Sequence, residues 1–301
     1  MHKYMRAIGF SKLKDRQELQ KLLTGIVVEG TQRAYTSCDE DVLLAAFGKD
    51  FAHCTDGPAG ASIGITVCGE FDKDDKFTYE YYFPYLKGSN VSSEEDVSVE
   101  RHAAQESYAG VCDDLRVGVS LIFYLQNVIP YVKAKNLGLL PIRGTTLSLG
   151  ALSTSGTVMM PIIKTERDLI KNQKVSMNRN QLLNAARRGD EEAIESLTLD
   201  DMDTYTAISK RIHKEDVFSL VDTYFMPYGV ECDQYSILGE IRECSLIKNQ
   251  LTGEELYVMT ICCNDLLFDV CINIEDLYGE PAVGRRFKGT IWMQGHINFP
   301  S

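Results

Sequence analysis

The sequence lacks the short motifs that identify common enzyme classes. It contains no CxxC pair, which excludes the commonest zinc and redox spacings. The glycine-rich segment at residues 53–60 has neither the GxxxxGK[ST] nor the GxGxxG pattern of phosphate loops, and an expected strand follows it where those loops lead into a helix. We interpret this segment as a plain turn.

The chain also lacks an apolar run long enough to cross a bilayer comfortably. Its most apolar stretch, Val117 to Val132, is short and includes Gln126, Asn127 and Pro130, so we expect a buried helix. The first twenty residues have no apolar core of the signal-peptide kind. We therefore expect no membrane association.

An excess of acidic residues limits the possible partners. The chain has 31 basic and 43 acidic residues and a formal net charge of −12. Such a surface repels phosphate backbones and anionic membranes, so we expect no nucleic-acid binding. The nine cysteines are odd in number and mostly lie beside apolar residues, which favours reduced, structural thiols and a cytoplasmic location.

Capping patterns predict several helices in the first half. Asp15 can cap a helix over residues 15–23 that Gly25 ends. Ser37 and Glu40 form a capping box for a second helix over residues 38–47. A long apolar helix over residues 113–135, bent at Pro130, would contain the apolar stretch described above.

Two hairpins are expected beside these helices. Alternating apolar residues over 63–67 and 77–83 flank a polar turn at 72–75, and residues 146–152 and 157–163 flank a second turn at 153–156. Tyrosines at 79, 81, 82 and 85 could line a ligand groove, although a core strand with a half-buried rim shows the same pattern. Hairpins mixed with helices indicate an α+β fold with antiparallel pairing.

The pattern changes twice after residue 165. Residues 176–225 are mostly helical in pattern, with Asp190 capping one helix and Thr198 and Asp201 capping the next. From Tyr235 onward the pattern is that of strands, over 237–247, 255–262, 266–272 and 285–299, with a tight turn at Asn264 and Asp265. We expect an α+β domain over 1–165, a helical connector over 166–233 and a small β-barrel, OB-like or SH3-like, over 234–301.

The last strand has one marked face. Phe287, Ile291 and Met293 point to one side, and the opposite side includes the single tryptophan of the chain. We regard that second face as a binding surface, with the candidate residues Arg286, Lys288, Trp292 and His296. Basic residues beside an aromatic ring are typical of OB folds that bind single strands, but the segment from residue 234 on has five basic and nine acidic residues. We therefore favour packing of Trp292 against the helical connector or against another chain.

A second candidate site lies in the first half. If residues 100–107 are helical, His102 and Glu106 lie one turn apart, a spacing that suits a metal ion or a histidine oriented for general-base catalysis. Asp113 could join them, and Cys112 could act as a nucleophile if a base is within reach. A solvated i,i+4 pair on a helix surface has the same spacing, so we assign no metal and no cofactor.

Three segments carry a resemblance to a known family. They are Met1–Phe10 (MHKYMRAIGF), Asp216–Gly229 (DVFSLVDTYFMPYG) and Asp233–Ile241 (DQYSILGEI). These segments resemble an uncharacterised bacterial family of proteins of about this length, so the resemblance covers the whole chain. It implies no activity and no functional residues.

Together these patterns favour a cytoplasmic binding or assembly protein that acts with a protein partner or by self-association, rather than an enzyme. The alternatives are a metal-dependent or His/carboxylate-dependent enzyme that uses His102, Glu106 and Asp113, and an OB-like oligonucleotide-binding module.

Overall fold

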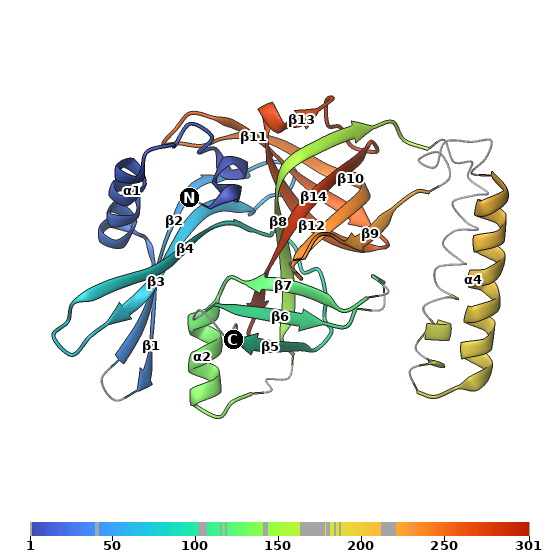
Figure 1. Ribbon diagram of the computed structural model, residues 1–301, viewed down its shortest axis with the longest axis horizontal. Coiled ribbons are helices and arrows are strands. Elements are labelled where there is room, and N and C mark those ends of the chain that lie inside the picture. The colour runs from blue at the N-terminus through green and yellow to red at the C-terminus, as the bar shows by residue number, and fades with distance from the viewer. Residues whose placement is uncertain are drawn as a thin grey trace.

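The chain folds into two β-sheets with helices at their margins (Figure 1). The computed structural model describes residues 2–39, 42–101, 107–114, 116–117, 119–140, 144–162, 178, 181–183, 185–186, 188–211, 221–230 and 232–300. A four-stranded sheet forms the N-terminal part, and the larger sheet contains a closed ring of five strands. The combination of mainly antiparallel sheets and helices confirms the α+β class in its broad sense.

The closed ring is a barrel that uses strands from two distant parts of the sequence. Its members are β8 (Thr146–Met159), β10 (Gln234–Lys248), β11 (Glu255–Cys263), β12 (Leu266–Asn273) and β14 (Arg286–Asn298). Strand β8 pairs with β12 in parallel and with β14 in antiparallel orientation, which closes the ring. The four C-terminal strands and the turn at Asn264 and Asp265, both with positive φ, are confirmed. The barrel is not contained within 234–301, because its fifth strand comes from residues 146–159.

The expected hairpin within residues 146–163 is wrong, because β8 continues through the presumed turn. The Ser153 hydroxyl donates a hydrogen bond to the carbonyl oxygen of Thr290 in β14. The backbone of Gly156 lies so close to the Phe287 ring that a Cβ atom there would clash. The small residues that resemble a turn therefore allow β8 to pair closely with β14, because larger side chains would clash with neighbours such as the Phe287 ring.

The long helix expected over residues 113–135 is also wrong. The segment forms β7 (Leu121–Leu125) and, after a break, α2 (Val128–Asn136), with Pro130 in the first helical turn, where a missing N–H group is tolerated. Strand β7 pairs with β6 (Tyr108–Cys112), which pairs with β5 (Val97–Arg101). It joins the barrel by a short parallel pairing with Gln294 and Gly295 of β14, just beyond the last residue that β14 pairs with β10.

The N-terminal sheet, called sheet A, has the order β1 (Gln32–Asp39), β2 (Val42–His53), β3 (Ser62–Phe71) and β4 (Phe77–Lys87). The hairpin of β3 and β4 is confirmed. The helix expected over residues 38–47 is wrong, since Phe47 of β2 and Tyr35 of β1 pack together on one sheet face. The helix capped by Asp15 is confirmed as α1 (Arg16–Glu29), but it passes through Gly25 and ends at Gly30.

Two apolar cores stabilise these layers. One fills the barrel and includes Phe287, Ile291 and Met293, as the alternation in the last strand predicts. The other lies between the outer barrel surface, sheet A, α1 and the 3₁₀ helix η1 (Lys3–Ile8). The outer face of β14 is therefore covered by the N-terminal part of the chain.

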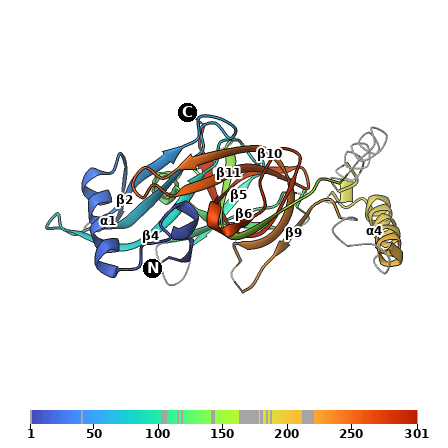
Figure 2. The same ribbon diagram turned by 90° about the horizontal axis from the view of Figure 1, so that it is seen from above.

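Helix α4 (Glu191–Arg211), between β8 and β10 in the sequence, lies to one side of the two sheets (Figure 1). Asp190 caps α4 by accepting a hydrogen bond from the Ala193 N–H group, as predicted. The separate helix expected after Thr198 and Asp201 is wrong, because α4 is continuous. Strand β9 (Tyr224–Pro227) follows and pairs with β10, and η2 (Ile274–Asp276) and β13 (Leu277–Tyr278) lie between β12 and β14. Helices α1 and α4 lie at opposite ends of the molecule (Figure 2). Among the described residues, no helix has both the length and the apolar character needed to cross a membrane.

Candidate functional site

Of the catalytic candidates, His102 and Glu106 lie outside the described residues. Glu100, at the start of the expected helix, belongs to strand β5. Asp113 follows the end of β6 and accepts a hydrogen bond from the Ser120 hydroxyl. Among the described residues, no group of three or more His, Cys, Asp or Glu side chains is arranged to hold a metal ion.

Cys112 lies fully buried at the end of β6. Burial raises the pKa of its thiol to about 11, with nearby acidic residues acting in the same direction. Its thiol donates to the Ser93 hydroxyl oxygen at 3.7 Å, and that hydroxyl donates in turn to Asp114. A thiol held protonated in this way is a weak nucleophile at neutral pH.

The second candidate set lies on β14, and its members have different surroundings. Trp292 is 5% exposed. Its ring stacks on Tyr4 of η1 with centroids 5.1 Å apart, and its indole N–H donates to a carboxylate oxygen of Asp233 at 2.7 Å. His2 and Tyr124 pack against the same ring. The contact that covers Trp292 is therefore made by its own chain.

Arg286 and Lys288 lie nearer the start of β14. The Arg286 guanidinium donates to the carbonyl oxygens of Met160 and Val221, at 3.1 and 3.0 Å. These bonds join the two ends of the segment that carries α4, so the buried Arg286 has a visible structural role. Lys288 is half-buried.

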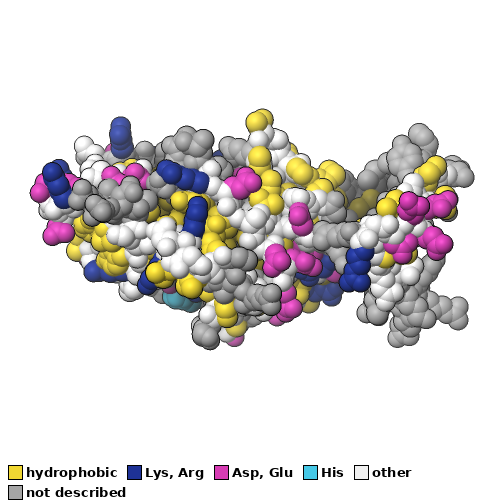
Figure 3. Space-filling view, turned by 90° about the horizontal axis from the view of Figure 1, so that it is seen from below, with side chains coloured by type: hydrophobic (Ala, Val, Ile, Leu, Met, Phe, Trp, Pro, Cys, Tyr) yellow, Lys and Arg dark blue, Asp and Glu magenta, His cyan; other side chains and the backbone are white. Residues whose placement is uncertain are grey.

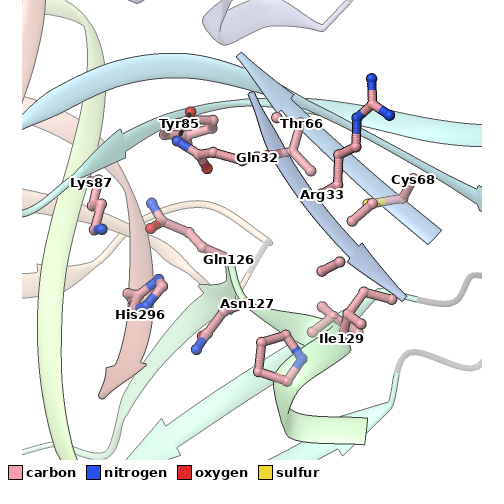
Figure 4. A pocket seen from close by; sticks show the side chains of 15 residues that line it. Gln32, Arg33, Thr66, Cys68, Tyr85, Lys87, Gln126, Asn127, Ile129 and His296 are labelled. Atoms are coloured by element: carbon pink, nitrogen blue, oxygen red, sulfur yellow. Dashed lines mark hydrogen bonds between the residues drawn. The ribbon is translucent and has the colours of Figure 1, made fainter. Parts of the chain in front are cut away.

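His296, the fourth residue of this set, lies at a cavity of about 190 Å³ between sheet A and the start of α2 (Figure 4). We call this cavity the α2 pocket. It is lined by residues from five strands and the α2 segment: Gln32, Arg33, Ala34, Ala46, Gly48, Thr66, Cys68, Tyr85, Lys87, Gln126, Asn127, Val128, Ile129, Pro130 and His296. The volume corresponds to about six water molecules, so the pocket suits a small organic molecule rather than a nucleotide.

The floor of the α2 pocket is made of small side chains in adjacent rows of sheet A. Ala34, Ala46 and Cys68 are register partners in one row, and Gly48 and Thr66 are partners in the next. Because successive residues of a strand alternate between faces, the large Phe47 and Val67 point to the opposite face, toward α1. The hollow thus follows from small residues on one face of three neighbouring strands.

The polar corner of the pocket contains Lys87, His296 and Gln126. Figure 4 shows the Lys87 ammonium group pointing toward the His296 ring, with Gln126 beside them. Burial lowers the pKa of His296 to about 4, and the nearby charge of Lys87 acts in the same direction. His296 is therefore neutral at pH 7. Neither the Lys87 ammonium group nor the His296 ring makes a hydrogen bond or ion pair with another described residue.

Other polar groups around the pocket are held by the protein. The Tyr85 hydroxyl donates to Asp50 at 2.7 Å, and burial raises the pKa of Tyr85. The Asn127 side chain both donates to and accepts from the backbone of Ile297. The Arg33 guanidinium donates to the carbonyl oxygens of Val28 and Gly30 at the end of α1. These hydrogen bonds hold the side chains of Tyr85, Asn127 and Arg33 in place. The side chains of Lys87 and His296 remain available to bind a ligand.

The pocket has a poor set of groups for catalysis. Cys68 is a floor residue, and burial raises the pKa of its thiol to about 12. His296 has no carboxylate partner among the described residues, although a catalytic base commonly has one to orient it. The arrangement is suited to binding rather than to nucleophilic or acid–base chemistry.

A second hollow of about 500 Å³ lies between α1 and the β3–β4 hairpin. Apolar side chains dominate its lining, including Leu19, Leu23 and Phe77, with Arg16 at one side. It offers fewer polar groups for orienting a ligand than the α2 pocket.

Sequence reasoning identified His296 but missed Lys87, Gln126 and the floor of the pocket. Lys87 is the last residue of β4 and lies beyond the strand predicted over residues 77–83, and its only local signal is a cation after an aromatic strand. Gln126 was placed inside an expected helix. Both gain their positions through pairing between segments far apart in sequence, which no local pattern records.

Comparison with known proteins identifies the family. The model of a family described as "Domain of unknown function, E. rectale Gene description (DUF3881)" matches residues 5–295. The chain belongs to this family. The match covers nearly the whole chain, which confirms the resemblance to an uncharacterised family of this length. Searches of curated proteins and of solved structures found no match.

Proposed function

We propose that the protein binds a small molecule in the α2 pocket. The observation that carries this proposal is the pair of polar side chains, Lys87 and His296, which face a preformed cavity without a partner among the described residues. Rigid, mostly apolar pockets with a few well-placed polar groups are typical of small-molecule sites. The small residues of sheet A provide such a shape without any rearrangement.

Binding is a better proposal than catalysis for the groups described. The thiols at Cys68 and Cys112 have raised pKa values, and His296 has a lowered one. Each of these shifts keeps the group uncharged near pH 7, whereas a nucleophilic thiol needs its thiolate form. The polar groups of the pocket therefore act as hydrogen-bond partners and, in Lys87, as a fixed charge.

We do not propose nucleic-acid binding. The closed ring of five strands supports the idea that the barrel is OB-like or SH3-like, but the ring of Trp292 is covered and is not available for stacking on a base. Figure 3 shows acidic and basic side chains interspersed over the described part of one face, without a basic stripe. The net charge of −12 opposes approach of a phosphate backbone.

Equilibrium dialysis against a mixture of polar cell metabolites tests small-molecule binding. We compare the wild-type protein with Ala34→Leu, which adds bulk to the pocket floor, and with Ser37→Leu, which adds the same side chain to β1 at an exposed position outside the pocket lining. Mass spectrometry should find a metabolite enriched by the wild type and Ser37→Leu but not by Ala34→Leu. If no metabolite is enriched, or if enrichment survives Ala34→Leu, the proposal is wrong.

Two further expectations from the sequence stay proposals. The eight described cysteines are all free thiols, which supports a reducing compartment such as the cytoplasm. A protein partner or self-association is also proposed, and sedimentation of the full chain across a concentration series tests it.

A further inference from the structure

Lys87 is the charged group that the α2 pocket offers to a ligand. It is the cation that faces the cavity without a described partner, since the other lining cation, Arg33, is hydrogen-bonded to two carbonyl oxygens. The neutral His296 adds a hydrogen-bonding group but no charge. The polar corner therefore complements one negative charge.

The apolar lining and the size of the pocket limit the uncharged part of the ligand. Besides its polar groups, the lining includes Ala34, Ala46 and Cys68 on the floor and Val128, Ile129 and Pro130 from α2. These side chains favour a short aliphatic group, because they offer no charge and little hydrogen bonding. A cavity of about 190 Å³ has no room for a long chain or for a ring system with phosphates.

We propose that the α2 pocket binds a small monocarboxylate, with its carboxylate against Lys87 and His296 and its aliphatic part over the floor of sheet A. The proposal rests on the small-molecule binding proposed above and names the ligand class. The ammonium group of Lys87 is at the exposed rim of the pocket, where water and salt weaken its attraction for an anion. We therefore expect a dissociation constant on the order of 1 mM for a generic member of the class.

Calorimetric titration with pentanoate, and with its neutral counterpart pentanamide, tests the ligand class. Pentanoate should bind the wild-type protein at least fivefold more tightly than pentanamide or inorganic phosphate. Lys87→Gln should weaken pentanoate binding at least fivefold, whereas Lys73→Gln, which makes the same charge change in the exposed turn between β3 and β4, should leave it unchanged.

The outcomes separate this inference from the proposed function. Equal binding of pentanamide and pentanoate, or equal binding of phosphate, overturns the monocarboxylate class even if dialysis finds another ligand in the pocket. Absence of pentanoate binding at 20 mM, a concentration of about twenty times the expected dissociation constant, overturns it as well. Loss of enrichment in the dialysis experiment instead counts against small-molecule binding itself.

Discussion

The side-chain amide of Gln294 hydrogen-bonds with the backbone of Leu86 across the junction of the two sheets. Its oxygen accepts from the Leu86 N–H group at 3.1 Å, and its nitrogen donates to the carbonyl oxygen of Pro84 at 2.8 Å. Gln126 donates both to the same oxygen of Gln294 and to the Leu86 carbonyl oxygen. The buried Gln294 side chain thus forms hydrogen bonds with the backbone at the edge of β4, as a neighbouring strand would. Lys87, which lines the α2 pocket, directly follows Leu86.

Replacing Gln294 by leucine should destabilise the fold by about 3 kcal/mol, because buried backbone groups of β4 lose their partners while the volume is nearly kept. Urea unfolding measures the change. Gln250→Leu, at an exposed position, is the matched control and should stay within about 0.5 kcal/mol of the wild type. An equal effect of both substitutions would contradict the role of Gln294.

The fluorescence of Trp292 should show that η1 buries its indole ring. Because this is the single tryptophan and is 5% exposed, its emission should be blue-shifted and poorly quenched by iodide. Tyr4→Ala removes the stacked ring and should shift the emission to the red, whereas Tyr278→Ala, at a residue 75% exposed, should not. Free quenching in the wild type would show that the indole is bare in solution.

A fragment of residues 232–301 should fail to unfold cooperatively, because β12 and β14 both lose β8. Asn298 and Thr146 are register partners on antiparallel strands, so a short glycine-rich turn can attach residues 144–160 after β14. This fusion should regain a cooperative transition by circular dichroism. A sharp transition in the fragment alone would show that four strands suffice.

Stability should fall as the pH drops from about 6.5 to about 4. Burial lowers the pKa of both His2 and His296 from 6.5 to about 4, so over this interval the unfolded chain takes up protons that the folded chain does not. Each histidine contributes a slope of at most about 1.4 kcal/mol per pH unit, and its contribution is constant above 6.5. His296→Gln should reduce the slope measured by urea unfolding at pH 5 to 7. A slope unchanged by His296→Gln would contradict this assignment.

Hydrophobic alternation predicted secondary structure correctly where one face of the strand lies in a core and the other does not. The alternation in β14 reports the barrel interior, because Phe287, Ile291 and Met293 face inward while their neighbours face another layer. The helix N-termini predicted at Asp15 and Asp190 are also correct, because an N-cap hydrogen bond joins residues close together in the sequence. The contact at Trp292 on the outer face of β14 is confirmed, but the covering residues come from the first ten of the chain rather than from the helical connector or a partner chain.

The wrong secondary-structure predictions fall in segments that pack against other elements on both faces. Residues 121–125 are apolar throughout because β7 lies against both the barrel and sheet A, and such a run does not distinguish a strand from a helix. Gly156 in the turn-like segment of β8 has no side chain because the Phe287 ring of β14 occupies that space. The α2 pocket was beyond sequence reasoning for the same reason, since its lining is contributed from residue 32 to residue 296.

Closure of the barrel by β8 constrains how the chain can fold during its synthesis. The side chains of Thr146 and Asn298 are hydrogen-bonded across a separation of 152 residues, so β8 leaves the ribosome long before its partner β14 exists. Until then its apolar residues and pairing edges are available to other chains. Contacts this distant in sequence also slow folding, because a long loop must close before they form. Strand β14, which is synthesised after the other four barrel strands, therefore completes the barrel and ends the period in which β8 is exposed to other chains.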